Sequence, residues 1–535
     1  MDLDNTTLPR VIGRAALEYG EAEGAVDTQD AAAPVRISFA KLVEEADATA
    51  ATLVASGLQP GEVVALWAPN TWEWVVAALA TFRAGGVLVP VNTRFKGREA
   101  AYVLQKSRTK FLFTVAGFLG ADYVGMLRES GEELPDLQEI VLLRGESAGA
   151  TSCTDLLARG DDASRAEVAV RSDAVKPDDL GLVMFTSGTT GLPKGVMVDH
   201  GPLVRVASIL GATLGIERGE RYLVINPFFH AFGFTCGIVP SLIYGSTIIP
   251  HAVFDPAVVL QKIQDERINI LPGPPAIFQA LLNYAELDRY DISSLRSCLT
   301  GAATIPEEMV VQMRERLRFE RVMTAYGMTE TTGLATTCRP GDDARTIATT
   351  SGRAIDDVEL RVVDDDGNDV PSGMPGELWV RGYQVTRGYL DDPEQTRATI
   401  TEDGWLRTGD IVVMDERGYI DITDRKKDMY IVGGFNAYPA EIERMMIEHD
   451  QIGQVAVIGV PDDRLGEVGV AFVIPAHGAQ LDEAEVLAWC RERMANYKVP
   501  RQVWVVDALP LNASNKVLKN DLRAEASARL AASVD

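Results

Sequence analysis

The sequence has few cysteines and few aromatic residues. Its 535 residues include five cysteines, and aromatic residues make up 7%. An odd number of cysteines does not suit a disulfide framework, and these five lack the close spacing of metal-binding cysteines. We therefore predict reduced and mostly buried thiols at Cys153, Cys236, Cys298, Cys338 and Cys490.

Long hydrophobic runs are also missing. The most apolar stretch, residues 72–91, is interrupted by Glu73, Arg83 and the pair Gly85-Gly86. A bilayer-spanning helix needs about 20 predominantly apolar residues. The first residues, MDLDNTTLPRV, do not follow the basic, apolar and small-residue order of a signal peptide. We expect no stable membrane insertion and a cytoplasmic location.

Basic residues are outnumbered. Lys and Arg number 51 against 77 Asp and Glu, which gives a formal charge of −26. Such a surface repels the phosphate backbone of nucleic acids and anionic lipids. We expect no nucleic-acid partner.

The length of the chain predicts two or more domains. Along the first four hundred residues, helical patterns alternate with short β-branched runs, which indicates an α/β fold with helices covering parallel sheets. One example is a helix over residues 72–84 followed by a buried strand over 87–91. Another is a helix from about Pro256 followed by a strand at Ile268–Leu271, which Pro272 ends.

The pattern changes towards the C-terminus. From Val358 short alternating strands, with a hairpin signal at Asp366-Gly367, predict a small antiparallel barrel or sheet. After the basic cluster at 425–427 the chain predicts a compact α+β region with helices near 439–449 and over 483–494. We therefore place a domain boundary near residue 425.

The segment Leu182–Val198 has the composition of a phosphate-binding loop. It reads LVMFTSGTTGLPKGVMV, with glycines and hydroxyl residues before Lys194. Glycines let the backbone approach an anion, N–H groups and hydroxyls donate to phosphate oxygens, and lysine adds positive charge. It is not a Walker-type P-loop, because Lys194 follows a proline. The predicted nucleotide-binding residues are Thr186, Ser187, Gly188, Thr189, Thr190, Gly191 and Lys194.

This segment resembles the signature of the adenylate-forming superfamily, which includes acyl-CoA synthetases, luciferases and peptide-synthetase adenylation domains. Four further segments resemble motifs of that superfamily in the same order. They are TAYGMTETTG at 324–333, GWLRTGD at 404–410, DRKKDMYIVGG at 424–434 and LPLNASNKVLK at 509–519. The resemblance covers almost the whole chain.

The second motif also has a chemistry of its own. Tyr326 offers a ring for stacking on a base, Gly327 and Thr329 follow, and Glu330 offers the hard oxygen ligands that Mg²⁺ prefers. The resemblance implies that Tyr326 packs on adenine, Thr329 contacts the α-phosphate and Glu330 holds the metal. It also implies an adenine-binding ledge at Gly301, Ala302 and Ala303.

Further roles come only from the resemblance. Asp410 would accept hydrogen bonds from both ribose hydroxyls, although Gly-Asp is also a common turn. Arg425 would lie near the ribose and the phosphates, Gly433 and Gly434 would contact the nucleotide, and Lys427 would be the hinge. The resemblance thus divides the chain into an N-terminal domain (1–424), a hinge (425–427) and a small mobile C-terminal domain (428–535).

Besides Thr329 and Glu330, two further residues are candidate catalytic groups. His230, in PFFHAFGF, matches the gate between the acyl pocket and the path of CoA, whereas a lone histidine among aromatics is otherwise a packed core residue. Lys516 would stabilise the charge that builds up when a carboxylate attacks the α-phosphorus. Asn515 stands before it where the superfamily usually has glycine, and asparagine tolerates left-handed backbone angles.

The resemblance implies an ATP-dependent carboxylate–CoA ligase that uses ATP, Mg²⁺ and coenzyme A and passes through an acyl adenylate. Two alternatives remain open: a stand-alone adenylation enzyme that loads a carrier protein, and a luciferase-like oxygenase. An adenylation domain for amino acids would usually carry an aspartate early in the segment FFHAFG. The sequence also leaves a homodimer open.

The substrate class follows from the residues around the expected acyl pocket. We expect residues 230–237, 273–278, 302–304 and 327–333 to line this pocket. Apart from the polar turn that carries Glu330 they are mainly apolar, and this indicates a hydrophobic acid, whether fatty, aryl or steroid-derived. The segments NPFFHAFGF, INILPGPPAIF and DMYIVGGFNAYPAEIE are similar to actinobacterial ligases that activate the propionate side chain of partly degraded steroid rings.

The role of Lys516 can be tested by separating the two half-reactions. Lys516→Ala should slow adenylate formation by about two to three orders of magnitude, because one preorganised charge donor is lost. Thioester formation from presynthesised acyl adenylate should change much less. Equal losses in the two half-reactions, measured by pyrophosphate and thioester release, would contradict the assigned role.

Overall fold

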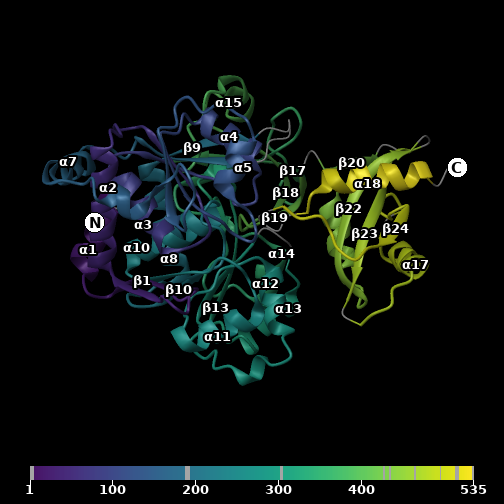
Figure 1. Ribbon diagram of the computed structural model, residues 1–535. Helices are drawn as coiled ribbons and strands as arrows, with labels where there is room; N and C mark the ends of the chain where they lie inside the picture. The colour runs from purple at the N-terminus through teal and green to yellow at the C-terminus, as the bar shows by residue number, and fades with distance from the viewer. Residues whose placement is uncertain are drawn as a thin grey trace. The chain divides into compact units, whose positions relative to one another are not determined.

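A computed structural model describes most of the chain: residues 5–186, 193–301, 305–425, 428–432, 435–462, 465–476, 478–494, 496–512 and 517–532. The chain forms two compact units (Figure 1). The first consists of Met1–Gly301, Ile305–Glu359 and Arg381–Leu406. The second consists of Ala302–Thr304, Leu360–Val380 and Arg407–Asp535.

A seven-stranded sheet in the first unit carries the candidate phosphate loop. Its order is β7-β6-β5-β3-β4-β8-β9, and its pairs are parallel except β8 with β9. Its central strands are buried apolar runs, as expected for a sheet that helices cover. The strands are β3 (Val63–Trp67), β4 (Val87–Pro90), β5 (Phe111–Val115), β6 (Glu139–Arg144), β7 (Thr151–Ser152), β8 (Leu180–Thr186) and β9 (Lys194–Asp199).

Two four-stranded sheets complete the strand framework of this unit. One has the order β10-β11-β1-β2 and the other β12-β13-β14-β15. Their strands are β1 (Glu23–Asp27), β2 (Val35–Ser38), β10 (Arg221–Val224), β11 (Thr247–Pro250), β12 (Ser297–Thr300), β13 (Arg321–Tyr326), β14 (Thr336–Thr337) and β15 (Arg353–Ala354).

The predicted strand at Ile268–Leu271 is wrong in extent. Only Ile270 forms bridges, in parallel to Tyr222 of β10 and to Ser297 of β12, and it thereby joins the two sheets. Arg267 before it has a left-handed φ of 50°. Pro272 after it lacks an N–H donor and restricts Leu271. The chain nevertheless continues beside β12, where the N–H groups of Leu271 and Gly273 donate to the carbonyls of Ser297 (3.1 Å) and Leu299 (2.9 Å).

Helices cover these sheets. The predicted helix at 72–84 is α3 (Trp72–Arg83), which Thr71 caps through its side chain and which ends before Gly85, at φ +75°. The predicted helix from Pro256 is α11 (Pro256–Glu266). The other long helices of the unit are α1 (Leu8–Tyr19), α2 (Phe39–Ala55), α4 (Gly97–Lys106), α7 (Asp162–Ala174), α8 (His200–Leu214), α12 (Pro275–Leu282) and α13 (Glu307–Glu315).

The second unit contains a four-stranded sheet and an α+β region. The sheet has the order β16-β17-β18-β19, with strands Val358–Val363, Pro375–Gly382, Leu406–Met414 and Ile420–Arg425. The predicted turn lies at Gly367, whose N–H donates to the carbonyl of Asp364 (3.1 Å). The α+β region contains β20 (Tyr430–Val432), β21 (Phe435–Ala437), α16 (Pro439–Met446), β22 (Ile452–Asp462), β23 (Gly466–Pro475), α17 (Glu483–Arg493), β24 (Gln502–Val505) and α18 (Lys519–Ala532).

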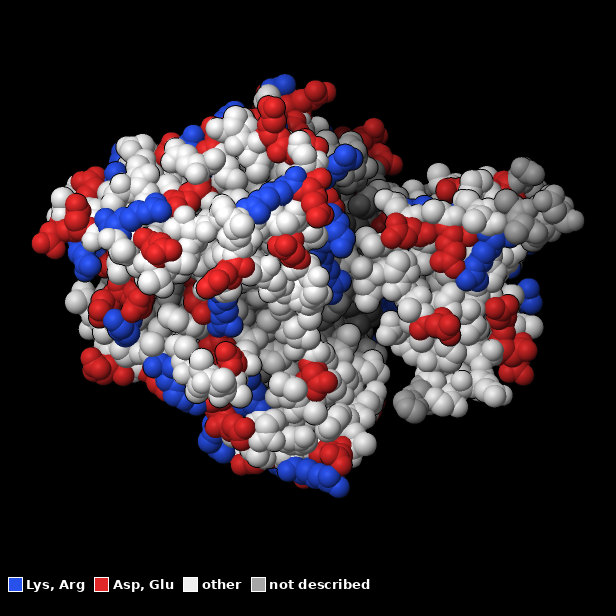
Figure 2. Space-filling model, in the orientation of Figure 1, with Lys and Arg blue, Asp and Glu red and all other residues white. Residues whose placement is uncertain are grey.

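The α/β fold class is thus confirmed, and so is the state of the thiols. All five cysteines are free, and all but Cys153 are buried. Among the described residues, none of the helices is both long and apolar enough to cross a membrane. Acidic and basic side chains are interspersed over the face that Figure 2 shows.

A buried histidine predicts how stability depends on pH. His200 is 2% exposed, and burial lowers its pKa from 6.5 to about 4. The unfolded chain binds a proton near pH 6.5 and the folded chain does not. The free energy of unfolding should therefore fall as the pH decreases from 6.5 to about 4, by up to about 3 kcal/mol from this group.

Denaturant unfolding of His200→Gln measures this contribution. The loss of unfolding free energy between pH 7 and pH 5 should be about 2 kcal/mol smaller in this variant than in the unmodified protein. An unchanged pH dependence in His200→Gln would contradict the prediction.

Candidate active site

The hairpin of β8 and β9 holds the base of the candidate phosphate loop. Thr186, the last residue of β8, pairs with Lys194, the first residue of β9. Below them Leu182 pairs with Val198, and both are buried. Ser187, Gly188, Thr189, Thr190 and Gly191 lie outside the described residues. The apolar strands therefore fix the two ends of the loop, as the sequence predicts.

A tight reversal follows β13. Strand β13 ends at Tyr326, which is 8% exposed, and the 3₁₀ turn η4 (Thr329–Thr331) follows. A Cβ at Gly327 would lie 2.2 Å from the carbonyl oxygen of Gly333, so this position requires glycine. The N–H of Gly333 donates to the carbonyl of Met328 (2.9 Å). The reversal presents Thr329 and Glu330 on a short, rigid turn.

Glu330 is a buried carboxylate, 8% exposed. Its Oε1 accepts a hydrogen bond from the hydroxyl of Tyr389 (2.8 Å). Burial and then the negative charge of Glu330 raise the pKa of Tyr389, so its hydroxyl stays protonated and remains a donor. The Lys194 ammonium lies 5.5 Å from the centroid of the Tyr389 ring. The first unit thus brings the lysine of the loop and the predicted metal carboxylate to one tyrosine.

These residues fit a magnesium nucleotide. Mg²⁺ in nucleotide sites commonly takes one or two carboxylates together with phosphate oxygens. Glu330 supplies such a carboxylate, and Thr329 beside it supplies a hydroxyl. Within the described ranges no three His, Cys, Asp or Glu side chains gather into a metal cluster of their own.

Gly301 lies directly after β12. A Cβ there would lie 3.1 Å from the carbonyl oxygen of Ala325 in β13, so the two strand ends approach closely. Its predicted partners in the adenine ledge, Ala302 and Ala303, lie outside the described residues. The small-residue ledge stays a prediction.

His230 begins an irregular helical segment. It caps α9 (Ala231–Gly233) with its Nδ1, which accepts from the N–H of Phe232 (3.1 Å). A π-helical turn (Phe234–Ile238) and α10 (Val239–Tyr244) follow. A Cβ at Gly333 would lie 3.2 Å from the Cβ of Ala231, so this segment contacts the turn that carries Glu330. His230 is partly exposed and is not a packed core residue.

Asn70, in the loop after β3, is hydrogen-bonded to the backbone of the segment that precedes His230. Its Nδ2 donates to the carbonyl of Asn226 (2.9 Å), and its Oδ1 accepts from the N–H of Phe228 (2.8 Å). Because the side chain is 4% exposed, these bonds are shielded from water. Asn70 therefore fixes the path of the chain two residues before His230.

The remaining predicted residues belong to the second unit. Asp410 lies in β18, is 5% exposed and pairs with Arg425 of β19 in the strand register. Its N–H donates to the hydroxyl of Thr408 (3.1 Å), beside Gly409 at φ +70°. Lys427, Gly433, Gly434 and Lys516 lie outside the described residues.

Sequence reasoning missed Tyr389 and Asn70. Asn70 precedes the cap residue of α3, and Tyr389 follows Arg387-Gly388 in a loop, so neither stands in a run of reactive residues. The only local signals are a polar residue three positions after the end of β3, for Asn70, and an aromatic residue directly after a glycine, for Tyr389. The roles of Asn70 and Tyr389 become visible only in their contacts with segments that are distant in the sequence.

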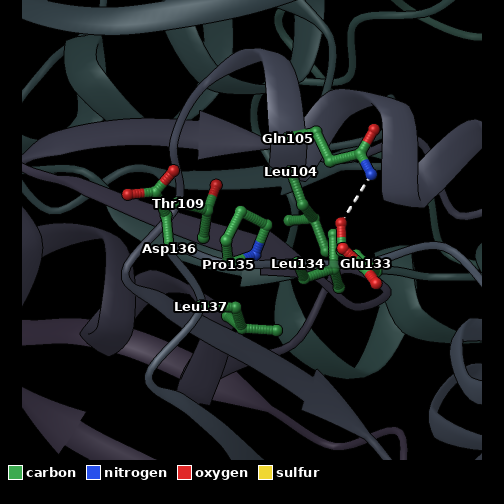
Figure 3. A pocket seen from close by; sticks show the side chains of 8 residues that line it. All are labelled: Leu104, Gln105, Thr109, Glu133, Leu134, Pro135, Asp136 and Leu137. Carbon is green, nitrogen blue, oxygen red and sulfur yellow. Dashed lines mark hydrogen bonds between the residues drawn. The ribbon is translucent and has the colours of Figure 1, made fainter.

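A surface hollow of about 350 Å³ lies apart from these residues (Figure 3). It is formed by the end of α4 and the loop at 133–137, and Gln105 Nε2 donates to the carbonyl of Glu133 there (2.6 Å). Its lining shares no residue with the candidate active site. The lining residues are Leu104, Gln105, Thr109, Glu133, Leu134, Pro135, Asp136 and Leu137.

Comparison with known families identifies the scaffold. Residues 14–390 match the family of AMP-binding enzymes, and residues 441–516 match the AMP-binding enzyme C-terminal domain. The chain belongs to the AMP-binding enzyme family. The domain that carries Lys194, Glu330 and Tyr389 is therefore the AMP-binding domain of this family.

Relatives extend over the whole chain. It is 46% identical over 97% of its length to the 3-[(3aS,4S,7aS)-7a-methyl-1,5-dioxo-octahydro-1H-inden-4-yl]propanoyl:CoA ligase of Rhodococcus jostii, of which it covers 99%. It is 47% identical over 91% of its length to the Mycobacterium tuberculosis ligase of the same name, of which it covers 94%. The anthranilate CoA ligase AuaEII in complex with anthranoyl-AMP has a similar structure, with a TM-score of 0.88, 25% identity and coverage of 99% and 98% of the two chains.

The predicted ribose contact of Asp410 can be measured directly. Asp410→Ala removes an acceptor for two hydroxyl groups, each hydrogen bond to a charged group being worth roughly 1.5 to 3 kcal/mol. In calorimetry with a non-hydrolysable ATP analogue, the dissociation constant of Asp410→Ala should be at least about tenfold higher than that of the unmodified protein. Glu402→Ala, which removes an exposed carboxylate eight positions earlier in the chain, is the matched control and should bind the analogue with the affinity of the unmodified protein. Equal affinities in the two variants would contradict the ribose role.

Proposed function

We propose that this protein is an ATP-dependent carboxylate–CoA ligase that acts on a propanoate side chain carried by a fused bicyclic ring. The acid attacks the α-phosphorus of ATP to give an acyl adenylate and pyrophosphate. The thiol of CoA then displaces AMP and forms the thioester. The two propanoyl:CoA ligases described above are similar to this chain over more than nine tenths of its length. They support both the reaction and the choice of a bicyclic propanoate as the acid.

One structural observation carries the first half-reaction. Lys194, Tyr389 and Glu330 converge at the end of the candidate phosphate loop. Such an arrangement supplies positive charge for phosphate oxygens and a carboxylate for a phosphate-bound Mg²⁺. We assign Lys194 to the phosphates and Glu330, with Thr329 beside it, to the metal. Lys516 would stabilise the attacking carboxylate and the α-phosphate.

The second half-reaction would use a domain rotation. We propose that residues 1–424 and 428–535 move as two bodies about Lys427, because the acyl adenylate must first be formed and then exposed to CoA. His230 would separate the acyl group from the path of the thiol. We place the reaction in the cytoplasm, where ATP and CoA are available.

The buried residues around His230 support a hydrophobic acyl group. Ala231, Phe234, Cys236 and Ile238 are buried and uncharged, and the contacting Gly333 adds no side chain. An apolar pocket favours a neutral ring over a charged substituent. The ketone oxygens of a bicyclic dione need only hydrogen-bond donors.

A pyrophosphate-release screen over acids, with and without CoA, tests the proposal. The bicyclic dione propanoate should have a kcat/KM at least about tenfold above octanoate and benzoate, the discrimination that hydrophobic pockets usually reach. Chelation of Mg²⁺ should abolish the release, and added Mg²⁺ should restore it. A higher kcat/KM for octanoate would refute the bicyclic acid as the substrate. Formation of the acyl adenylate without formation of the thioester would refute CoA as the acceptor.

A further inference from the structure

The segment at 384–390 connects the two parts of the candidate nucleotide site. On one side the N–H of Thr386 donates to the carbonyl of Glu330 (2.8 Å). On the other side the N–H of Leu390 donates to the carbonyl of Gly195 (2.8 Å), and the N–H of Met197 donates to the carbonyl of Gly388 (3.1 Å). The segment thus bonds both to η4, which carries Glu330, and to β9, which begins at Lys194.

Tyr389 is held firmly within this segment. It forms an antiparallel bridge with Val196 of β9, and its N–H donates to the hydroxyl of Thr396 in α15 (Pro393–Thr399) at 3.0 Å. Its side chain is 6% exposed. A buried ring on a backbone that is bonded on both sides has little freedom to change rotamer.

The two ends of this side chain contact groups of opposite charge. The hydroxyl donates to Glu330 Oε1 at 2.8 Å, and the face of the ring lies 5.5 Å from the Lys194 ammonium. A hydrogen bond from a fixed donor restricts the orientation of a carboxylate. An ammonium over an aromatic face is attracted by the negative charge of that face.

We propose that Tyr389 is the positioning residue of the nucleotide site: its hydroxyl orients the Glu330 carboxylate for the metal, and its ring holds the Lys194 ammonium for the phosphates. This inference rests on the proposed function, since it assigns those roles to Glu330 and Lys194. It accounts for the hydrogen bonds that join the segment at 384–390 to both parts of the site.

Two substitutions separate the hydroxyl from the ring. Tyr389→Phe keeps the ring near Lys194 and removes the donor to Glu330. Tyr389→Leu removes both. Tyr383→Phe is the matched control, because Tyr383 lies in the same part of the chain and its ring contacts Arg205, with the guanidinium carbon 3.9 Å from the ring centroid.

Binding is measured by calorimetry with a non-hydrolysable ATP analogue, first without metal and then with Mg²⁺ or Mn²⁺ titrated into the complex. In Tyr389→Phe we expect metal affinity to fall about 10- to 100-fold, the usual effect of losing a partner of a metal-binding carboxylate. The metal-free affinity for the analogue should change less than about twofold, because the ring that contacts Lys194 remains.

Tyr389→Leu should in addition weaken metal-free binding of the analogue by about two- to fivefold, the effect expected from losing the ring under Lys194. Tyr383→Phe should match the unmodified protein in both measurements. In pyrophosphate release, Tyr389→Phe should need correspondingly more Mg²⁺ for half-maximal rate, with the KM for the acid unchanged.

The proposal is overturned if the metal affinity of Tyr389→Phe is within about twofold of that of the unmodified protein, whether or not the melting temperature changes. Tyr389 would then contribute to packing and not to the orientation of Glu330. A loss of analogue affinity that is equal with and without metal would also overturn it. If the unmodified protein binds the metal and analogue but activates no acid, the ligase proposal fails while the binding series still decides the role of Tyr389.

Discussion

The candidate active site depends on one carboxylate that the fold buries, Glu330. Burying a polar group is costly unless it is hydrogen-bonded, and Glu330 is 8% exposed. The hydroxyl of Tyr389 donates a hydrogen bond to its Oε1, and the ammonium of Lys194 lies 5.5 Å from the centroid of the same ring. A buried carboxylate supported in this way is ready for a metal ion without reorganisation.

The rest of the first unit places the segments that meet at this carboxylate. The antiparallel pair β8–β9 ends a parallel sheet and delivers Lys194. The turn after β13 delivers Glu330, and it can be so tight only because Gly327 lacks a side chain. The segment at 384–390 bonds to both, and Asn70 fixes the neighbouring turn before His230.

Much of the fold could be predicted because its signals are local. The helix at 72–83 has its cap at Thr71 and its end signal at Gly85, and the hairpin turn at 364–367 has its Asp-Gly pair. The strand at 268–271 shows where such reasoning fails. Its apolar pattern is that of a buried strand, but only Ile270 forms bridges to β10 and β12, between the left-handed Arg267 and Pro272.

The sequence by itself determined the α/β architecture and the family, because both depend on local patterns and contiguous motifs such as TSGTTGLPKG or TAYGMTE. Only the tertiary structure decided how Lys194 and Glu330 are connected. Tyr389 is 195 positions from Lys194 and 59 from Glu330, since 389 − 194 = 195 and 389 − 330 = 59. A hydrogen bond and a ring contact over such separations leave no periodic or local signal, and they form only when the sheet, the turn and the connecting segment pack together.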